Sequence, residues 1–325
     1  MERIDAHIHF DSEHPAYAEQ LAEWNMKFLN TIGGVEHPEW RARRAEPYAR
    51  LAAAYPERFG WVTSFDLPRF GDPEYAERCI AGLEADFARG AVGCKIWKSF
   101  GLGFRDPEGR HVLVDHPILE PILSFLERSG KTLLIHIADP IGGWQPLGPE
   151  NLTSNFYRKH PDKYAYGNPA FPAHEALIAS RDRIVERHPK LRVVGAHLGS
   201  LEFDASELAR RFERYPNFAV DTSGLARALA LGLQDRGLVR RICIEFQDRL
   251  LFGSDQHAHP QDAESAEARA KAMSSIREGH AAAFAYYESD GRVKLREHEV
   301  QGLGLPEPVL RKLYVENARR WYPGL

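Results

Sequence analysis

The chain has only three cysteines in 325 residues, and their number and spacing exclude cysteine-based frameworks. Cys79, Cys94 and Cys243 lie far apart and form no Cys-x-x-Cys pair, so neither a disulfide scaffold nor a structural zinc knuckle is indicated. Cysteines of this kind usually serve as small apolar side chains in the core. We therefore expect three buried thiols without a redox role.

The sequence also lacks long apolar runs and any large excess of charge. No run approaches the roughly 20 apolar residues that a membrane-spanning helix needs. A formal net charge of −4 offers no basic surface to nucleic acid. Repeats and low-complexity tracts are missing, and the first apolar run begins at residue 3, which leaves no room for a signal peptide. We expect a cytoplasmic protein that binds neither membranes nor nucleic acid.

What the chain does contain is a regular alternation of short apolar runs and helical stretches. Several runs are almost wholly apolar, as strands are when both faces of a parallel sheet are covered. Strands are predicted at 3–8, 26–32, 59–65, 92–97, 132–137, 191–196, 217–221 and 249–253. Helices are predicted at 73–89, 117–129, 173–188, 205–215, 225–246 and 306–321.

This alternation predicts a single α/β domain over residues 1–325, a (β/α)8 TIM barrel. An open doubly wound sheet is the structural alternative. It should carry a Gly-rich phosphate-binding turn after its first strand, where this chain has His7-Ile8-His9. Long segments follow the fourth, fifth and eighth strands, at 98–116, 138–172 and 256–290, the last largely helical. Because all three leave C-terminal strand ends, we expect them to build a substrate pocket together.

Side chains that bind metals end several of these strands. His7 and His9 close the first strand, His136 the fifth and His197 the sixth, while Asp255 follows the eighth. Side chains alternate along a strand, so His7 and His9 point the same way and can reach one cation. Neutral imidazole suits Zn, Mn, Fe or Co. Each residue alone can be a hydrogen-bonded structural group, but their shared position at strand ends favours a metal centre.

Lys95 ends the fourth strand and has three interpretations. It can pair with an acid for structure, hold a substrate carboxylate or phosphate as a cation, or take up CO2. The last reaction gives a carbamate, an anion able to bridge two metals. The sequence leaves all three open.

The ordered set of strand-end residues resembles that of the amidohydrolase superfamily. Two local strings are similar to its amidohydrolase-related branch, Val194-Gly195-Ala196-His197-Leu198-Gly199 and Leu251-Phe252-Gly253-Ser254-Asp255. The C-terminal Leu310-Arg311-Lys312-Leu313-Tyr314 with Glu316-Asn317-Ala318 is also similar to that branch. The resemblance spans the whole chain, and it is specific for the superfamily rather than for a substrate.

The resemblance implies one divalent metal, zinc, held by His7, His9, His136 and Asp255. His197 would then be the general base or electrophile beside it. A carbamylated Lys95 would instead imply two metals, with His136 and His197 holding the second. Lys95, His197 and Asp255 are therefore the candidate catalytic residues.

The implied reaction is hydrolysis of a lactone, ester or amide by metal-activated water, with His197 or Asp255 accepting the proton. Members of the same branch decarboxylate aromatic or muconate-type acids, which is the alternative enzymatic interpretation. A barrel that binds a ligand without catalysis is a third. The resemblance is also compatible with a homodimer.

Aromatic and cationic residues after the fourth and fifth strands are candidates for substrate binding. They are Trp97, Lys98, Arg105, Trp144, Tyr157 and Arg158. Such residues near a metal favour a small anionic substrate, for example a carboxylated ring or a sugar acid. The alternative is that Arg158 is solvated and Trp144 packs within its loop.

Overall fold

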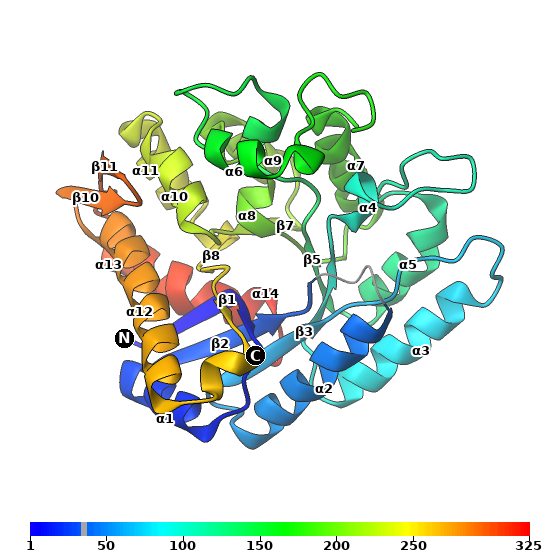
Figure 1. Ribbon diagram of the computed structural model, residues 1–325, viewed down its shortest axis with the longest axis horizontal. Coiled ribbons are helices and arrows are strands. Elements are labelled where there is room, and N and C mark those ends of the chain that lie inside the picture. The colour runs from blue at the N-terminus through cyan, green and yellow to red at the C-terminus, as the bar shows by residue number, and fades with distance from the viewer. Residues whose placement is uncertain (34–37) are drawn as a thin grey trace.

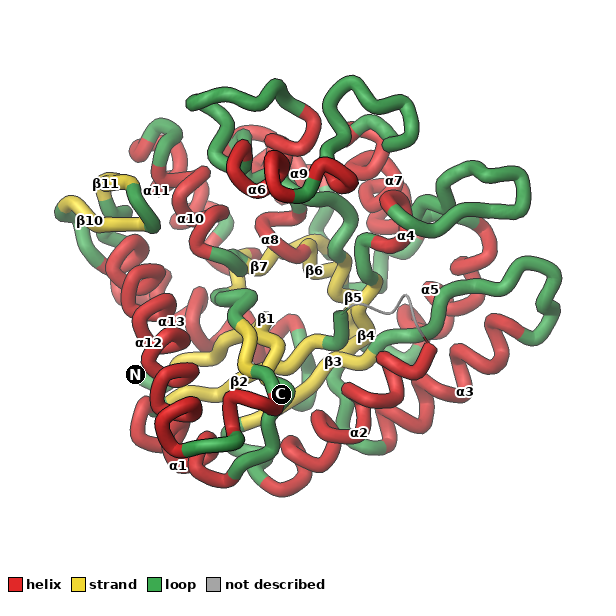
Figure 2. Tube along the Cα trace, viewed as in Figure 1, coloured by secondary structure: helices red, strands yellow, loops and turns green. Residues whose placement is uncertain are grey.

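A closed sheet of parallel strands occupies the centre of the molecule, and helices surround it (Figure 1, Figure 2). The computed structural model describes residues 1–33 and 38–325, without the side chains of residues 38–43. Each strand pairs in parallel with the next in sequence. The strands are β1 (Arg3–Phe10), β2 (Met26–Thr31), β3 (Phe59–Thr63), β4 (Gly93–Ile96), β5 (Thr132–Ile135), β6 (Val193–Gly195), β7 (Phe218–Asp221) and β8 (Leu250–Leu251). All eight predicted strands are confirmed.

Hydrogen bonds between β1 and the segment after β8 close the barrel. The Ala6 N–H donates to the Phe252 carbonyl at 2.8 Å, and the Asp255 N–H donates to the His7 carbonyl at 2.8 Å. Beyond them a short strand, β9 (His257–Ala258), pairs with the end of β1. This closure confirms the (β/α)8 barrel and rules out the open doubly wound sheet.

Amphipathic helices cover the outside of the barrel. They are α1 (Pro15–Trp24), α2 (Pro38–Ala54), α3 (Tyr75–Ala88), α5 (Glu120–Arg128), α7 (His174–Arg187) and α9 (Ala205–Arg214). The predicted helix at 225–246 is instead two helices, α10 (Leu225–Gly232) and α11 (Arg236–Glu245). The Asp235 carboxylate accepts from the Leu238 N–H at 2.6 Å, so it caps a new helix where one continuous helix was predicted.

The predicted C-terminal helix is present with a wider turn in its middle. It consists of α13 (Glu307–Arg311), the π-helical turn η6 (Lys312–Glu316) and α14 (Asn317–Trp321). A π turn frees carbonyls from the regular helical ladder, and the Leu313 carbonyl accepts from the Phe252 N–H at 2.9 Å. The Asn317 side chain donates to the Leu250 carbonyl at 2.7 Å. The C-terminus is thereby fastened to β8.

The long segments after β4, β5 and β8 contain helices of their own. They include α4 (Ser99–Leu102), α6 (Ser154–Lys159) and α12 (Ala266–Glu288), so the segment at 256–290 is largely helical, as predicted. Single 3-10 turns lie at η1 (Pro117–Leu119), η2 (Ile141–Trp144), η3 (Pro161–Lys163), η4 (Gln247–Arg249) and η5 (Pro260–Ala263).

A hairpin that was not predicted, β10 (Arg292–Leu295) and β11 (His298–Gln301), follows α12 and packs against α10 (Figure 1). The cysteines are buried and free of disulfides, as expected. Within the described ranges, no helix is both long and apolar enough to cross a bilayer.

Candidate metal centre and adjoining clefts

The C-terminal half of β1 directs His7 and His9 toward Asp255, which lies in the turn after β8. His9 Nε2 is 3.4 Å and His7 Nε2 3.6 Å from the same oxygen, Asp255 Oδ1. One donor atom of each residue lies within 4.8 Å of the other two. Ligands about 2.0–2.2 Å from a zinc ion are separated by a few ångströms, so these three donors fit one cation.

His197 and Asp255 both adopt a left-handed backbone conformation, with φ of 56°. For residues other than glycine this conformation costs about 1 kcal/mol or more, and it is concentrated at functional sites. His197 lies in the left-handed turn α8 (Ala196–Gly199), directly after β6. Arg181, which is fully buried, donates to the Gly199 carbonyl and holds this turn in place.

Asp221, at the end of β7, orients two of the histidines and was missed by the sequence analysis. Its Oδ2 accepts from His7 Nδ1 at 2.8 Å, and its Oδ1 accepts from the backbone N–H of His197 at 2.8 Å. A hydrogen atom on Nδ1 leaves the lone pair of His7 on Nε2, the atom that faces Asp255. Burial alone would raise the pKa of Asp221, but its electrostatic interaction and hydrogen bond with His7 hold the pKa well below its ordinary value.

The pattern that identified His136 and His197, a metal-binding side chain at the end of an apolar strand, also fits Asp221. It is a carboxylate that ends an apolar run, Phe218-Ala219-Val220. A donor atom of Asp221 also lies within 4.8 Å of donors from His7 and His197. These three donors lie close together because both histidines are hydrogen-bonded to Asp221.

His197 is fixed through Ser223. The Ser223 hydroxyl donates to Asp221 Oδ1 and lies 2.8 Å from His197 Nδ1, so its oxygen accepts from that nitrogen. His197 Nε2 is then 3.9 Å from Asp255 Oδ2 with its lone pair available. Burial lowers the pKa of His197 to about 3, and it lowers the pKa of His9 well below the ordinary value. Neutral imidazoles of this kind are ready to bind a metal.

The structure places His136 at the border of this cluster rather than inside it. Its ring centroid is 4.4 Å from that of His197 and 4.9 Å from that of Trp97. Its Nε2 lies 3.2 Å from the Ala138 carbonyl, so this nitrogen carries the hydrogen. Its Nδ1 is buried and has no hydrogen-bond partner among the described residues. An unpaired, buried lone pair on Nδ1 is therefore available for a ligand.

Lys95 is fully buried beside the histidines. Its Nζ lies 2.9 Å from His7 Nε2 and 3.1 Å from the Thr31 hydroxyl. In the described part of the chain no carboxylate lies within 4.0 Å of this Nζ, so a structural ion pair has no direct partner there. Burial lowers the pKa of Lys95 to about 8.

Asp255 keeps its charge in this environment. Burial would raise its pKa, but the imidazoles of His197, His9 and His7 together hold the pKa well below its ordinary value. No lysine or arginine of the described residues lies within 4.0 Å of this carboxylate, and the charge of Lys95 acts on it only from farther away. This is the electrostatic condition in which a divalent cation binds well.

Three adjoining clefts surround the mouth of the barrel. The first, of about 290 Å³, reaches Asp255 and is bordered by Arg227 and Arg296. The second, of about 510 Å³, is lined by Trp97, Lys98 and Asp139 among others. The third, of about 640 Å³, shares Asp139 with the second and both arginines with the first. Together they offer the volume that a small ligand requires.

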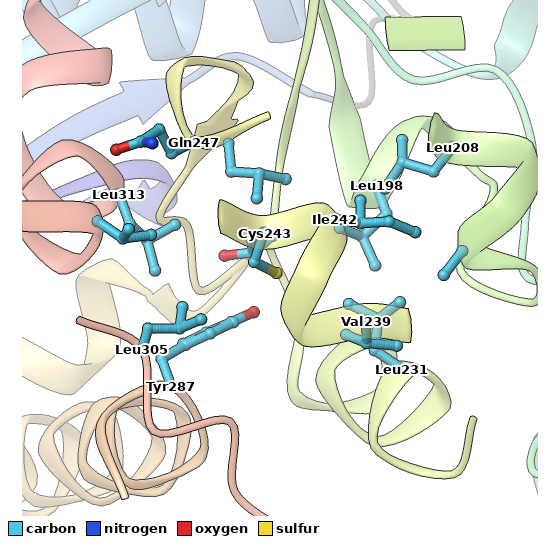
Figure 3. A pocket seen from close by; sticks show the side chains of 14 residues that line it. Leu198, Leu208, Leu231, Val239, Ile242, Cys243, Gln247, Tyr287, Leu305 and Leu313 are labelled. Atoms are coloured by element: carbon cyan, nitrogen blue, oxygen red, sulfur yellow. The ribbon is translucent and has the colours of Figure 1, made fainter. Parts of the chain in front are cut away.

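Figure 3 shows a different cavity, inside the packing between α9, α10 and α11. It measures about 20 Å³ and is lined by apolar side chains such as Leu198, Val239 and Ile242. This volume holds at most one water molecule, so the cavity is a packing gap and not a substrate site. Burial there raises the pKa of Cys243 to about 12, which keeps its thiol protonated.

Three of the predicted substrate-binding residues, Trp97, Lys98 and Tyr157, line these clefts. Lys98 forms an ion pair there with Asp139. Tyr157 is buried, and its hydroxyl lacks a hydrogen-bond partner in the part of the chain that the structure describes. The segments after β4 and β5 therefore meet beside the candidate metal centre, as predicted.

The other three predicted residues lie outside the clefts described above. The Arg105 guanidinium donates to the Gly109 carbonyl at 2.7 Å and the Ala170 carbonyl at 2.9 Å. The Trp144 indole donates to the Pro172 carbonyl at 2.8 Å, so this ring packs within its loop. Arg158 is exposed on α6. The packing of Trp144 and the exposure of Arg158 fit the alternative interpretation for these two residues.

Comparison with known proteins agrees with the barrel fold. A family model described as Amidohydrolase (Amidohydro_2) matches residues 4–324. Among curated proteins, none matches the sequence significantly. The family match therefore rests on nearly the whole barrel, including every strand.

Solved structures with the same fold cover almost the whole chain. A dihydroxybenzoic acid decarboxylase from Polaromonas sp. JS666, with bound manganese, has a TM-score of 0.55 and 14% identity over 99% of this chain and 96% of its own. A putative 2-pyrone-4,6-dicarboxylic acid hydrolase from Pseudomonas putida has a TM-score of 0.53 and 14% identity over 99% of this chain and 98% of its own. A 4-oxalomesaconate hydratase from Rhodopseudomonas palustris has a TM-score of 0.52 and 13% identity over 99% of this chain and 96% of its own. At such identities the likeness establishes the barrel fold alone.

Proposed function

Because this chain belongs to the amidohydrolase family, we propose that it is a metal-dependent hydrolase of a small anionic lactone, ester or amide. One observation carries the proposal. Donor atoms of His7, His9 and Asp255 lie within 4.8 Å of one another at the C-terminal mouth of the barrel. That mouth is where barrels of this type hold their active sites.

In this proposal His7, His9 and Asp255 hold one divalent ion, preferably zinc, and His136 contributes its unpaired Nδ1 as the fourth ligand. The donor set fits such an ion, since it combines neutral imidazoles with an ionised carboxylate. When bound, the ion supplies Lewis acidity that activates a water molecule and polarises a carbonyl group. Asp221 keeps the His7 imidazole in the tautomer that such a site requires.

His197 is the proton acceptor in the proposed reaction, with Asp255 as the second candidate. The His197 Nε2 is unprotonated and lies 3.9 Å from Asp255 Oδ2, so either group can take a proton from a water molecule between them. Ser223 accepts from His197 Nδ1 and holds the ring in this orientation. Once protonated, the same imidazole is able to donate to the leaving group.

The proposed substrate lies in the clefts beside Asp255. Trp97 and Tyr157 supply aromatic surface, and Lys98 supplies a positive charge. The solved Pseudomonas putida protein is described as a putative hydrolase of 2-pyrone-4,6-dicarboxylic acid, an anionic lactone, which supports this substrate class. A cytoplasmic location and a homodimer complete the proposal, and cell fractionation and light scattering test them.

A decarboxylase is the second candidate, supported by the likeness to the manganese-bound dihydroxybenzoic acid decarboxylase. The two activities are separable with one set of measurements. Purified protein of known metal content is incubated in H₂¹⁸O with lactones, esters, amides and aromatic acids. A hydrolase incorporates ¹⁸O into its organic product, while a decarboxylase releases CO2 and leaves its organic product without ¹⁸O. Protein that retains no metal and converts no compound would be a ligand-binding barrel instead.

A further inference from the structure

Arg227, in the first turn of α10, carries a charge that nothing in the described structure neutralises directly. It borders both the cleft that reaches Asp255 and the larger cleft next to it. Its Nε is buried without a hydrogen-bond partner among the described residues, and no described carboxylate lies within 4.0 Å of its guanidinium. A guanidinium has five N–H donors, and a partly buried one without an acceptor is unfavourable. An anionic ligand would supply the acceptor and the negative charge that the Arg227 guanidinium lacks.

Two further residues line the same cleft. The Tyr157 hydroxyl is buried and unpartnered within the described ranges, and Tyr157 lines the larger cleft together with Arg227. Arg296, at the tip of the β10–β11 hairpin, lines both clefts and is exposed. The nearby Asp139 carboxylate already binds Lys98. Glu297 is a second carboxylate on the larger cleft, so Arg227 and Arg296 together leave a small excess of positive charge there.

We propose that Arg227, Tyr157 and Arg296 form a carboxylate-binding subsite, separate from the metal centre, that selects small dicarboxylic substrates. One carboxylate would bind the guanidinium of Arg227 through paired N–H donors and accept a further hydrogen bond from Tyr157. The reacting end of the substrate would then reach Asp255 through the cleft that Arg227 shares with it. This orientation rests on the proposed function, but the subsite itself requires no metal.

Glu202 provides the competing explanation for Arg227. Its Oε1 accepts from the Ile141 N–H at 3.1 Å, while its Oε2 is buried and unpartnered in the described part of the chain. Burial raises the pKa of Glu202, and the charge of Arg227 opposes that rise, so the two groups interact electrostatically. If Arg227 serves only to stabilise Glu202, removing it will change stability and not ligand affinity.

Isothermal titration calorimetry with isophthalate, a small dicarboxylate, tests the subsite in chelator-treated and zinc-loaded protein. Arg227→Met should weaken isophthalate binding to the metal-free protein by about tenfold or more, because charge-assisted hydrogen bonds are lost. Tyr157→Phe should weaken it by roughly threefold to tenfold without lowering the Tm, since the hydroxyl has no partner to lose. Arg128→Met, at an exposed position on α5, is the matched control and should bind isophthalate normally.

Equal isophthalate affinity in wild type and Arg227→Met would overturn the subsite. The subsite would also be overturned if Arg227→Met lowers the Tm without changing the isophthalate affinity, and if adding Glu202→Gln to that variant restores the Tm. If Arg227→Met does not fold, Arg227→Lys decides the question, because it keeps the charge and should still lose several-fold affinity. If the protein never retains zinc but binds isophthalate in a way that depends on Arg227, the proposed hydrolase activity is refuted and the subsite is supported.

Discussion

His280 Nε2, from α12, lies 2.8 Å from Asp5 Oδ2, and both side chains are buried behind the candidate metal centre. The other oxygen of Asp5 accepts from the backbone N–H of His7 at 3.1 Å and of Ser254 at 3.0 Å. Asp5 therefore fastens β1 to the turn that carries Asp255. The long segment after β8 supports the site from its rear in this way, in addition to shaping the clefts.

Replacing His280 by phenylalanine keeps an aromatic ring of somewhat larger volume and leaves the buried Asp5 Oδ2 without its side-chain partner. We expect the free energy of unfolding to fall by roughly 3 kcal/mol, the loss seen when one member of a buried pair is removed. Urea denaturation of chelator-treated protein measures this loss. Arg292→Ala removes an exposed pair with Glu299 and should change stability by less than about 1 kcal/mol. An equally small effect for His280→Phe would show that the Asp5 contact is dispensable.

Asp221→Asn tests whether the carboxylate behind His7 tunes the metal ligand. The amide is able to donate to His7 Nδ1 as well as accept from it, so the favoured tautomer is lost. We expect zinc affinity to fall about 10- to 100-fold, as measured by competition with a chelating dye. Asp248→Asn, at the partly exposed carboxylate that pairs with Lys312, is the control. Unchanged affinity in Asp221→Asn would remove Asp221 from the proposed site.

The strands were predictable because the signals that define them are local. Runs such as Leu133-Leu134-Ile135 are apolar throughout, and helix boundaries coincide with caps, glycines and prolines. The break at Asp235 was visible in the same way, as a capping residue inside the predicted helix at 225–246. The apolar periodicity on both sides of it concealed the break.

The exact positions of the site residues depend on contacts that a sequence does not display. The left-handed turn at His197 is held by Asp221 and Arg181, and the one at Asp255 accompanies the closure of the barrel. Arg105 was selected for its charge, but its guanidinium donates to two carbonyl groups, and one of them, that of Ala170, is distant in sequence. Arg227 carried no signal of its own, since an arginine in a helix is usually solvated.

His174 is one of several buried histidines that make the stability of the folded protein depend on pH. It is buried outside the metal cluster, and burial lowers its pKa to about 4. Between pH 6.5 and about 4 the unfolded chain therefore binds a proton that the folded chain does not. His174 should thus reduce the free energy of unfolding as the pH falls through this window, by up to about 1.4 kcal/mol per pH unit.

His174→Phe should make this decline shallower at little cost in stability near pH 7, because the Nε2 of His174 is buried and unpartnered among the described residues. Urea denaturation at a series of pH values measures the slope. His298→Phe, at an exposed position of β11, is the control. A slope in His174→Phe that equals the wild-type slope would refute the assignment.

Lys95→Met separates the one-metal site from the two-metal alternative. The Lys95 amine lies 2.9 Å from His7 Nε2, so its positive charge opposes a cation bound at that atom. With one metal, wild type and Lys95→Met should both retain one zinc per chain in elemental analysis, and the variant should bind zinc at least as tightly. With two metals, the variant loses a bridging carbamate, and its metal content falls below that of the wild type. Lys271→Met, at an exposed position on α12, should match the wild type in either case. A wild-type content of two that drops in Lys95→Met would replace the mononuclear proposal with the binuclear one.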